Sequence, residues 1–115
     1  MAAEKNFENK IKRYLDSLEC WHVKFFANAY TKSGIPDLLA CINGYFVAIE
    51  VKAENGSPSV LQKYNVERLN RENGFAVVVR PSQWDDLKLM IMSLKYNAEE
   101  QARELCTKIN TPWGI

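Results

Sequence analysis

The fold of this chain is decided by residues 33–52, which read S-G-I-P-D-L-L-A-C-I-N-G-Y-F-V-A-I-E-V-K. Two apolar segments flank Asn43-Gly44, the dipeptide that best supports the two positive φ angles of a type I′ hairpin turn. A two-residue turn fixes the pairing of its strands, so we expect Asp37 to lie opposite Glu50. The segment therefore predicts an antiparallel hairpin with two carboxylates across its ladder.

The two carboxylates need compensation, because cross-strand partners lie roughly 5 Å apart and like charges at that distance repel. Side chains alternate along a strand, so Lys52 shares a face with Glu50 while Val51 points to the other face. An acid pair this close shares a proton or holds a cation, and oxygen ligands beside an ammonium suit Mg²⁺ or Mn²⁺. The alternative is an ordinary hairpin in which Asp37 caps a loop and both Glu50 and Lys52 are solvated.

The composition is that of one globular domain: of 115 residues, 47% are hydrophobic and 25% charged. The net charge of +1 means that any nucleic-acid surface is a local patch and not a global field. Three cysteines without Cys-x-x-Cys spacing and a single histidine cannot build the usual zinc site. No apolar run approaches the length of a membrane span, so we expect no membrane contact and a cytoplasmic protein.

The periodicity of apolar residues predicts the elements around the hairpin. A helix between two strands is a crossover, so the last strand should lie parallel to an earlier one. The hairpin strands are apolar on both faces, which predicts a sheet covered on both sides. The expected elements are a helix over 4–18, a strand over 21–27, a polar loop over 28–35, the hairpin, a helix from 59 to 73, a strand over 75–80, and helices over 83–95 and 98–109.

Two polar side chains of the helices could reach the hairpin. Glu8 lies at the edge of the apolar stripe of the first helix, from which a carboxylate can reach a neighbouring site. A pair with Lys12 at i+4 is the simpler interpretation of Glu8, and Glu4 could substitute for it from the first turn. Gln62 lies three residues after Ser59, a spacing that fits a capping box and by itself explains the glutamine. Gly74 suits the C′ position after that helix.

The order of elements, helix, strand, acidic hairpin, helix and strand, is that of the PD-(D/E)-x-K nuclease core. Pro36-Asp37 and Glu50-Val51-Lys52 supply its motif. Three further runs resemble the stand-alone VRR-NUC nucleases of phages and bacteria: G-I-P-D-L-L at 34–39, I-E-V-K at 49–52 and Ser-x-x-Gln at 59–62.

The resemblance covers roughly residues 4–80. It implies an α/β, restriction-endonuclease-like fold, in which helices flank a mixed central sheet. We expect a single domain over 1–115, with this core at about 4–80 and a C-terminal helical extension over 81–110.

The resemblance also implies roles for individual residues. Asp37, Glu50 and the backbone carbonyl of Val51 would hold Mg²⁺ or Mn²⁺, with Glu8 as a further candidate ligand. Lys52 would be the catalytic lysine, and Gln62 the helix glutamine near the site. Such a metal polarises a phosphate and lowers the pKa of a bound water, which suits phosphodiester hydrolysis.

We therefore expect a metal-dependent DNA endonuclease that is selective for branched DNA, similar to Holliday-junction resolvases, in the host cytoplasm if a phage encodes it. Lys24 and Lys32 are candidate DNA contacts because they lie near the acidic end of the hairpin, and Tyr30 is a candidate because it could stack on a base. The alternative is a catalytically silent nuclease fold that binds DNA or a partner. An intact set of Asp37, Glu50 and Lys52 argues against silence, since a binding module has no need for a repulsive acid pair.

A homodimer is expected from the helix over 83–95, which is apolar nearly all round. One face can pack on the sheet, but Leu89, Met90 and Met92 spread beyond that stripe and need another partner. The terminal helix could cover some of them within one chain. A two-fold dimer would place two metal sites on one DNA junction.

Overall fold

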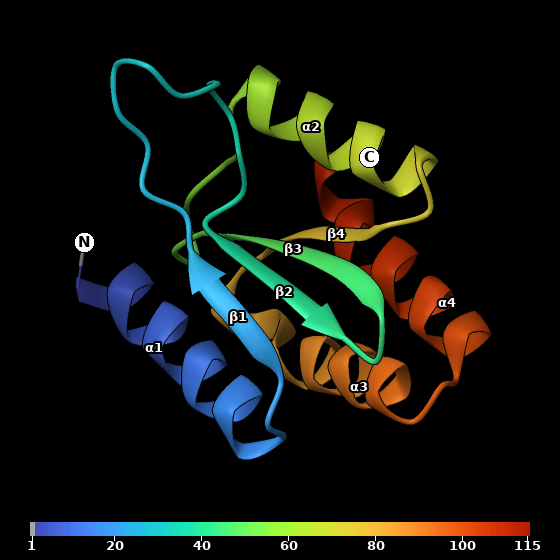
Figure 1. The fold of residues 1–115 in the computed structure, drawn as a ribbon. Helices are drawn as coiled ribbons and strands as arrows, with labels where there is room; N and C mark the ends of the chain where they lie inside the picture. The colour runs from blue at the N-terminus through green and yellow to red at the C-terminus, as the bar shows by residue number, and fades with distance from the viewer. Residues whose placement is uncertain (1) are drawn as a thin grey trace.

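The computed structural model describes residues 2–115 and contains a four-stranded sheet with helices on both faces (Figure 1). Met1, which the expected domain of 1–115 includes, lies outside the described residues. The elements are α1 (Ala2–Ser17), β1 (Trp21–Lys24), β2 (Leu38–Ile42), β3 (Tyr45–Val51), α2 (Val60–Arg71), β4 (Phe75–Val79), the 3₁₀ turn η1 (Pro81–Gln83), α3 (Trp84–Lys95), α4 (Glu99–Asn110) and the 3₁₀ turn η2 (Thr111–Trp113). No helix within 2–115 is long and apolar enough to cross a membrane. The mixed α/β architecture confirms the predicted fold class.

The sheet has the order β1-β2-β3-β4, with antiparallel pairing up to β3 and parallel pairing of β3 with β4. The hairpin register is the predicted one, since Ala40 pairs with Val47 and Ile42 with Tyr45. Asn43 and Gly44 have φ angles of +52° and +84°, as a type I′ turn requires. The predicted crossover is confirmed as well, because α2 carries the chain from β3 to a parallel β4.

The core lies on both faces of the sheet. On one face α1, α3 and α4 bury a large cluster that includes Phe7, Ile11, Leu15, Leu38, Val47, Ile49, Leu87, Ile91 and Ile109. On the other face α2 and the C-terminal tail bury a smaller cluster of Ala48, Val66, Ala76, Val78 and Trp113. This second cover does not extend to β1 or to the start of β3, so Trp21 and Phe46 stay 63% and 45% exposed. The expected two-sided cover is thus complete only over β4 and the later part of β3.

The first strand is shorter than the expected 21–27, because β1 ends at Lys24. Phe25 still donates to the backbone oxygen of Asp37, at 2.8 Å, but the chain then leaves the ladder. Asn28 begins a local turn, in which its side-chain oxygen accepts from the amide of Tyr30 and its amide donates to the hydroxyl of Thr31. Such local bonds compete with strand pairing, which is why the strand stops early.

The end of α2 differs in detail from the prediction. The residue with a left-handed backbone is Asn73, with φ of +69°, and not Gly74. The amide of Asn73 donates to the oxygen of Asn70 and the amide of Gly74 to that of Leu69, which together form a Schellman motif. Gly74 is suited to its position by space, because an added Cβ would lie 3.1 Å from the Leu69 oxygen.

The C-terminal residues close the free edge of β4, a role that no sequence pattern indicated. The side-chain amide of Asn110 accepts from the backbone amide of Val78 at 3.0 Å and donates to the oxygen of Ala76 at 2.9 Å. The indole of Trp113 donates to the oxygen of Val78 at 2.8 Å. Asn70 of α2 completes the edge by pairing with both backbone groups of Ala76. Side chains therefore occupy the positions that another strand would take.

The helix over 83–95 exposes a smaller apolar surface than the sequence predicted. Met90 is fully buried in the main core, so the expectation that it needs a partner outside the chain is wrong. Helix α4 packs closely on α3, and Met90 belongs to the same core cluster as Ala102, Cys106 and Ile109 of α4. Leu89 and Met92 stay 49% and 38% exposed, as expected.

Candidate active site

Asp37 is fixed at the open end of the hairpin, one residue before β2 begins. Its Oδ2 accepts a hydrogen bond from the backbone amide of Val51, at 2.9 Å. This bond crosses from the approach to β2 onto β3, so the carboxylate is held against the strand that carries Glu50 and Lys52. The alternative with a solvated hairpin is wrong, because Glu50 is only 2% exposed and the side chain of Lys52 only 16%.

The loop that leads into Asp37 is held by α2. The side-chain amide of Asn65 donates to the backbone oxygens of Ser33 and Gly34, at 3.1 and 2.9 Å. Gly34 has φ of +77°, and a Cβ there would lie 2.8 Å from the backbone carbon of Leu61. Glycine is needed for both reasons, conformation and space. The glycine of the G-I-P-D run thus lets the loop approach α2 closely enough to aim Asp37.

One oxygen of Glu50 is hydrogen-bonded, and the other has no partner in the described part of the chain. Its Oε2 accepts from Nε2 of Gln62 at 3.1 Å and lies 3.4 Å from Nζ of Lys52. Its Oε1 is buried and has no hydrogen-bond partner among residues 2–115. Burial and the neighbouring charge of Asp37 raise the pKa of Glu50 to about 8, although Lys52 acts in the opposite direction. A buried carboxyl oxygen without a partner is costly unless something else binds it.

Gln62 serves the helix and the site together. Its Oε1 accepts from the backbone amide of Ser59, and the Ser59 hydroxyl accepts from the amide of Gln62, so the predicted capping box is present. Its Nε2 points to Glu50. The two interpretations of Gln62 that the sequence left open are therefore compatible, since each uses a different atom of one amide.

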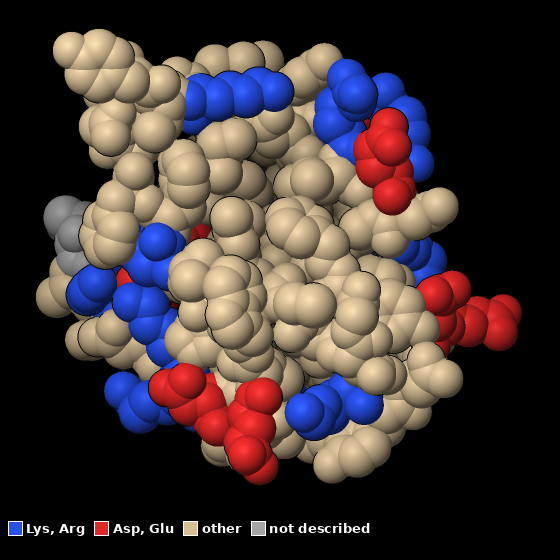
Figure 2. Space-filling view, viewed as in Figure 1, with Lys and Arg blue, Asp and Glu red and all other residues tan. Residues whose placement is uncertain are grey.

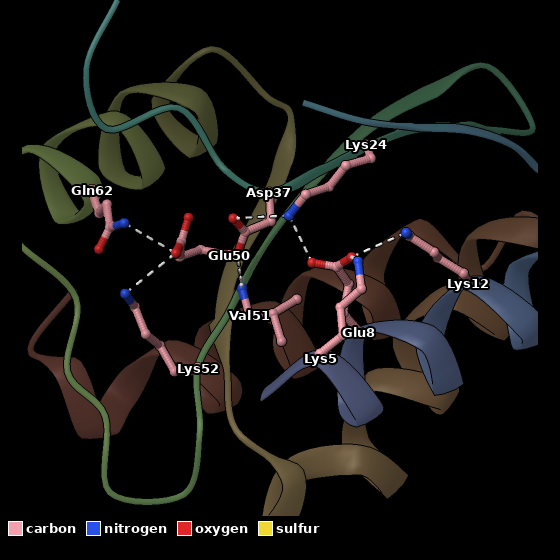
Figure 3. A network of polar contacts seen from close by, with 9 residues as sticks. All are labelled: Lys5, Glu8, Lys12, Lys24, Asp37, Glu50, Val51, Lys52 and Gln62. Carbon is pink, nitrogen blue, oxygen red and sulfur yellow. Dashed lines mark hydrogen bonds and ion pairs between the residues drawn. The ribbon is translucent and has the colours of Figure 1, made fainter. Parts of the chain in front are cut away.

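Glu8 is a buried carboxylate surrounded by three lysines, as Figure 3 shows. Its Oε1 lies 2.7 Å from Nζ of Lys24, and its Oε2 lies 3.0 Å from Lys12 and 3.2 Å from Lys5. Burial alone would raise the pKa of Glu8, but the hydrogen bonds from Lys24, Lys12 and Lys5 outweigh it and lower the pKa to about 2. The i+4 pair with Lys12 is confirmed, and Glu8 also reaches the hairpin through Lys24.

Lys24 connects α1 to the hairpin. Its Nζ lies 3.5 Å from Oδ1 of Asp37 as well as 2.7 Å from Glu8. Burial alone would lower the pKa of Lys24, but Glu8 and Asp37 raise it overall, so the ammonium stays charged. In Figure 3, Asp37 lies between Glu50 and Lys24. The sequence placed Lys24 near the acidic end of the hairpin but gave no sign of its contact with Glu8.

The other two candidate DNA contacts lie outside this network. Lys32 lines a groove between the 28–36 loop and α2, together with Pro36, Tyr64 and Arg68. Tyr30 is 97% exposed at the tip of the same loop. The structure therefore brings Asp37, Glu50, Lys52, Gln62, Glu8 and Lys24 together and leaves Lys32 and Tyr30 at the surface nearby. Lys5 is a member of the network that sequence reasoning missed, although its i+3 spacing to Glu8 could have indicated it.

The donor set fits a hard divalent cation. Asp37 and Glu50 offer carboxylate oxygens, the ligand type that Mg²⁺ and Mn²⁺ prefer, and Oε1 of Glu50, which no residue of 2–115 contacts by a hydrogen bond, is available to such an ion. Within 2–115 no three side chains of His, Cys, Asp or Glu are grouped so that they could hold a metal together. A metal here would therefore take two carboxylates and complete its ligands from the backbone, solvent or substrate.

A mixed sheet flanked by helices, with Asp, Glu and Lys at one end of a hairpin, is the arrangement of PD-(D/E)-x-K nucleases. A comparison with protein families matches residues 2–71 to the archaeal Holliday junction resolvase (Hjc) family. The match covers more than half of the chain, which therefore belongs to this family of nucleases. Comparisons with curated proteins and with solved structures gave no match.

Proposed function

We propose that the protein is a metal-dependent endonuclease that cuts branched DNA, such as a four-way junction. The observation that carries this proposal is Glu50, a buried carboxylate beside Asp37 with one oxygen positioned by Gln62 and Lys52 and the other without a partner among residues 2–115. Burial and the charge of Asp37 disfavour ionisation of Glu50, and a cation bound to both carboxylates would favour it. The Holliday junction resolvase family supplies the class of substrate.

Asp37, Glu50 and the backbone carbonyl of Val51 would hold one Mg²⁺ or Mn²⁺. When bound, such an ion polarises a phosphate oxygen and lowers the pKa of a bound water. Lys52 would place its ammonium where negative charge develops on the phosphate during hydrolysis. Gln62 would keep Glu50 in one orientation, so that the carboxylate need not reorganise as the reaction proceeds.

The DNA would approach over the side of the molecule where α1 and β1 lie. Figure 2 shows lysine and arginine atoms gathered there, with a cluster of acidic atoms at the lower end of this side. Lys24 would meet the DNA backbone at this side, and Lys32 and Tyr30 would meet backbone or bases from the 28–36 loop, since phosphate neutralisation supplies most non-specific affinity. Within the superfamily, the G-I-P-D and I-E-V-K runs also support a relation to the stand-alone VRR-NUC nucleases.

A homodimer would suit this substrate, because two symmetric strands must be cut. Leu89 and Met92 on α3, with Tyr14 of α1, line a shallow and mainly apolar hollow that is bordered by Asp85 and Lys88. Exposed apolar side chains with a charged border are typical of interaction sites. Two copies related by a two-fold axis could bury this surface against itself and present two sites to one junction.

The proposal is tested by incubating the protein with labelled linear, flapped and four-way-junction DNA, with Mg²⁺, with Mn²⁺ or with a chelator. We expect cleavage of the junction only when a divalent ion is present, and none by Asp37→Asn or Glu50→Gln. Retained cleavage by both variants would refute the site. Junction binding without cleavage in every metal would instead favour the catalytically silent alternative.

A further inference from the structure

The charged residues of the site follow one another in Figure 3, and from Asp37 through Lys24 and Glu8 to the lysines of α1 their signs alternate. The series begins with Lys52 beside Glu50 and continues through Asp37, Lys24 and Glu8 to Lys5 and Lys12. Among the labelled residues, the neighbours of like sign are Glu50 and Asp37. These two carboxylates could share a divalent ion, whereas the space between Asp37 and Glu8 already contains the ammonium of Lys24.

Each oxygen of Glu8 faces a cation of the chain. Oε1 lies 2.7 Å from Lys24, and Oε2 lies 3.0 Å from Lys12 and 3.2 Å from Lys5. A divalent ion at Glu8 would have to compete with these three ammonium groups, which already balance the charge of the carboxylate. The carboxylate is 6% exposed, so little solvent is present to screen these ion pairs.

Each oxygen of Asp37 also has its own partner. Oδ2 accepts from the amide of Val51, on the side of Glu50, and Oδ1 faces Lys24, on the side of Glu8. Two-metal nucleases hold their ions roughly 4 Å apart and use carboxylates to bridge them. In this protein an ammonium lies between Asp37 and Glu8, where a second ion would be expected.

We propose that Lys24 serves as the second cation of this site, so that each chain takes one divalent ion and not two. This inference rests on the proposed metal at Asp37 and Glu50 and adds the number of ions and the reason for it. Lys24 is then a positioning residue: it fixes Asp37 through Oδ1 and ties the metal side of the site to α1 through Glu8. Glu8 acts through Lys24 and does not bind the metal.

The inference is tested by counting Mn²⁺ ions bound to the full chain at saturation, by equilibrium dialysis with electron paramagnetic resonance of the free ion. We expect one ion per wild-type chain. Lys24→Met should bind two, because Oε1 of Glu8 and Oδ1 of Asp37 then lose their cation. Lys12→Met is the matched control and should stay at one, since it removes an ammonium from Glu8 but not from Asp37.

A double variant, Lys24→Met with Glu8→Gln, should return to one ion, because the second carboxylate is neutralised. This variant also removes both partners of the ion pair, so it leaves no uncompensated buried carboxylate at that position if Lys24→Met alone folds poorly. Two ions on the wild-type chain would overturn the role of Lys24 and leave the proposed function intact. No bound ion would overturn both. If wild type and folded Lys24→Met each bind one ion, Lys24 only forms ion pairs with Asp37 and Glu8, and its proposed role as the second cation is wrong.

Discussion

Gln62 holds Glu50 with the same amide group that starts helix α2. Its Nε2 donates to Oε2 of Glu50 at 3.1 Å, and its Oε1 accepts from the amide of Ser59 at 2.8 Å. The side chain is therefore fixed at both ends. A glutamine that is already ordered by helix capping loses little further conformational entropy when it positions a carboxylate. The start of the helix and the geometry of the site are coupled through one residue.

Two substitutions distinguish the role of Gln62 in capping α2 from its role in positioning Glu50. Ser59→Ala removes one capping bond and should lower the free energy of unfolding by about 1 kcal/mol while leaving most cleavage in place. Gln62→Ala should destabilise by a similar amount but reduce cleavage further, because Glu50 loses its donor. Thermal unfolding and junction cleavage of both variants check this. Equal losses of cleavage would show that Gln62 acts only through the helix.

The free energy of unfolding should depend on Glu50 in a pH range that its raised pKa defines. The pKa is about 8 in the folded protein and 4.5 for a free glutamate, so the folded state holds more protons between these values. Stability of the metal-free protein should therefore fall as pH rises from about 5 to 8.

Glu50→Gln should remove this dependence. The variant should be more stable than wild type by about 2 kcal/mol at pH 9, the order expected for an unsatisfied buried group, and the difference should vanish near pH 4. Denaturant unfolding in a chelator measures it. Added Mn²⁺ should stabilise wild type only, since an ion that binds the folded state alone shifts the equilibrium toward it. A variant that is less stable at pH 9 would contradict this account.

Lys52 should act mainly in the transition state. Lys52→Ala should lower kcat by about 100-fold or more, the scale for loss of one charge-stabilising group, with little change in KM or in bound Mn²⁺. Single-turnover cleavage at saturating enzyme separates the rate from binding. A rise in KM alone would make Lys52 a phosphate anchor.

Glu8 should matter more than Glu4 for cleavage. Glu8 is buried with three lysines, whereas Glu4 lies in the first turn of α1 and is partly exposed. Glu8→Ala should destabilise by about 2 kcal/mol and reduce cleavage, because Lys24 then loses its anchor. Glu4→Ala should change stability by less than about 0.5 kcal/mol. The same cleavage assay compares them, and a larger loss for Glu4 would reverse the assignment.

The homodimer should form through α3 and dissociate when that surface is charged. Sedimentation equilibrium at micromolar concentration should give twice the chain mass for wild type and the single mass for Leu89→Glu. Val60→Glu is the control, since Val60 is 83% exposed at the start of α2, on another element. A wild-type mass of one chain that does not change with concentration would exclude a stable dimer and remove the physical basis for symmetric cutting.

Local signals in the sequence were sufficient for the hairpin and for α2. Asn43-Gly44 set the turn and with it the register, and Ser59 with Gln62 marked the start of the helix. These features depend on neighbours within four residues. The approach of Glu50 to Asp37 followed from the register alone, which is why two residues far apart in sequence could be predicted to meet.

The contacts between elements could not be predicted in this way. Lys24 meets Glu8 because α1 packs against β1, and no periodicity encodes that packing. Trp113 belongs to a short tail without apolar spacing, yet it is buried against β4. Met90 was expected at a surface because the stripe of one helix says nothing about how much a second helix will cover.

The side chains that occupy the free edge of β4 come largely from beyond residue 71, where the family match ends. A chain shortened before Asn110 would keep every candidate catalytic residue, yet it would present open backbone groups on which another chain can add a strand. We therefore expect the shortened chain to aggregate, although its candidate catalytic residues are unchanged. Protection against self-association is thus encoded apart from the nuclease motif, at the opposite end of the sequence from Glu8.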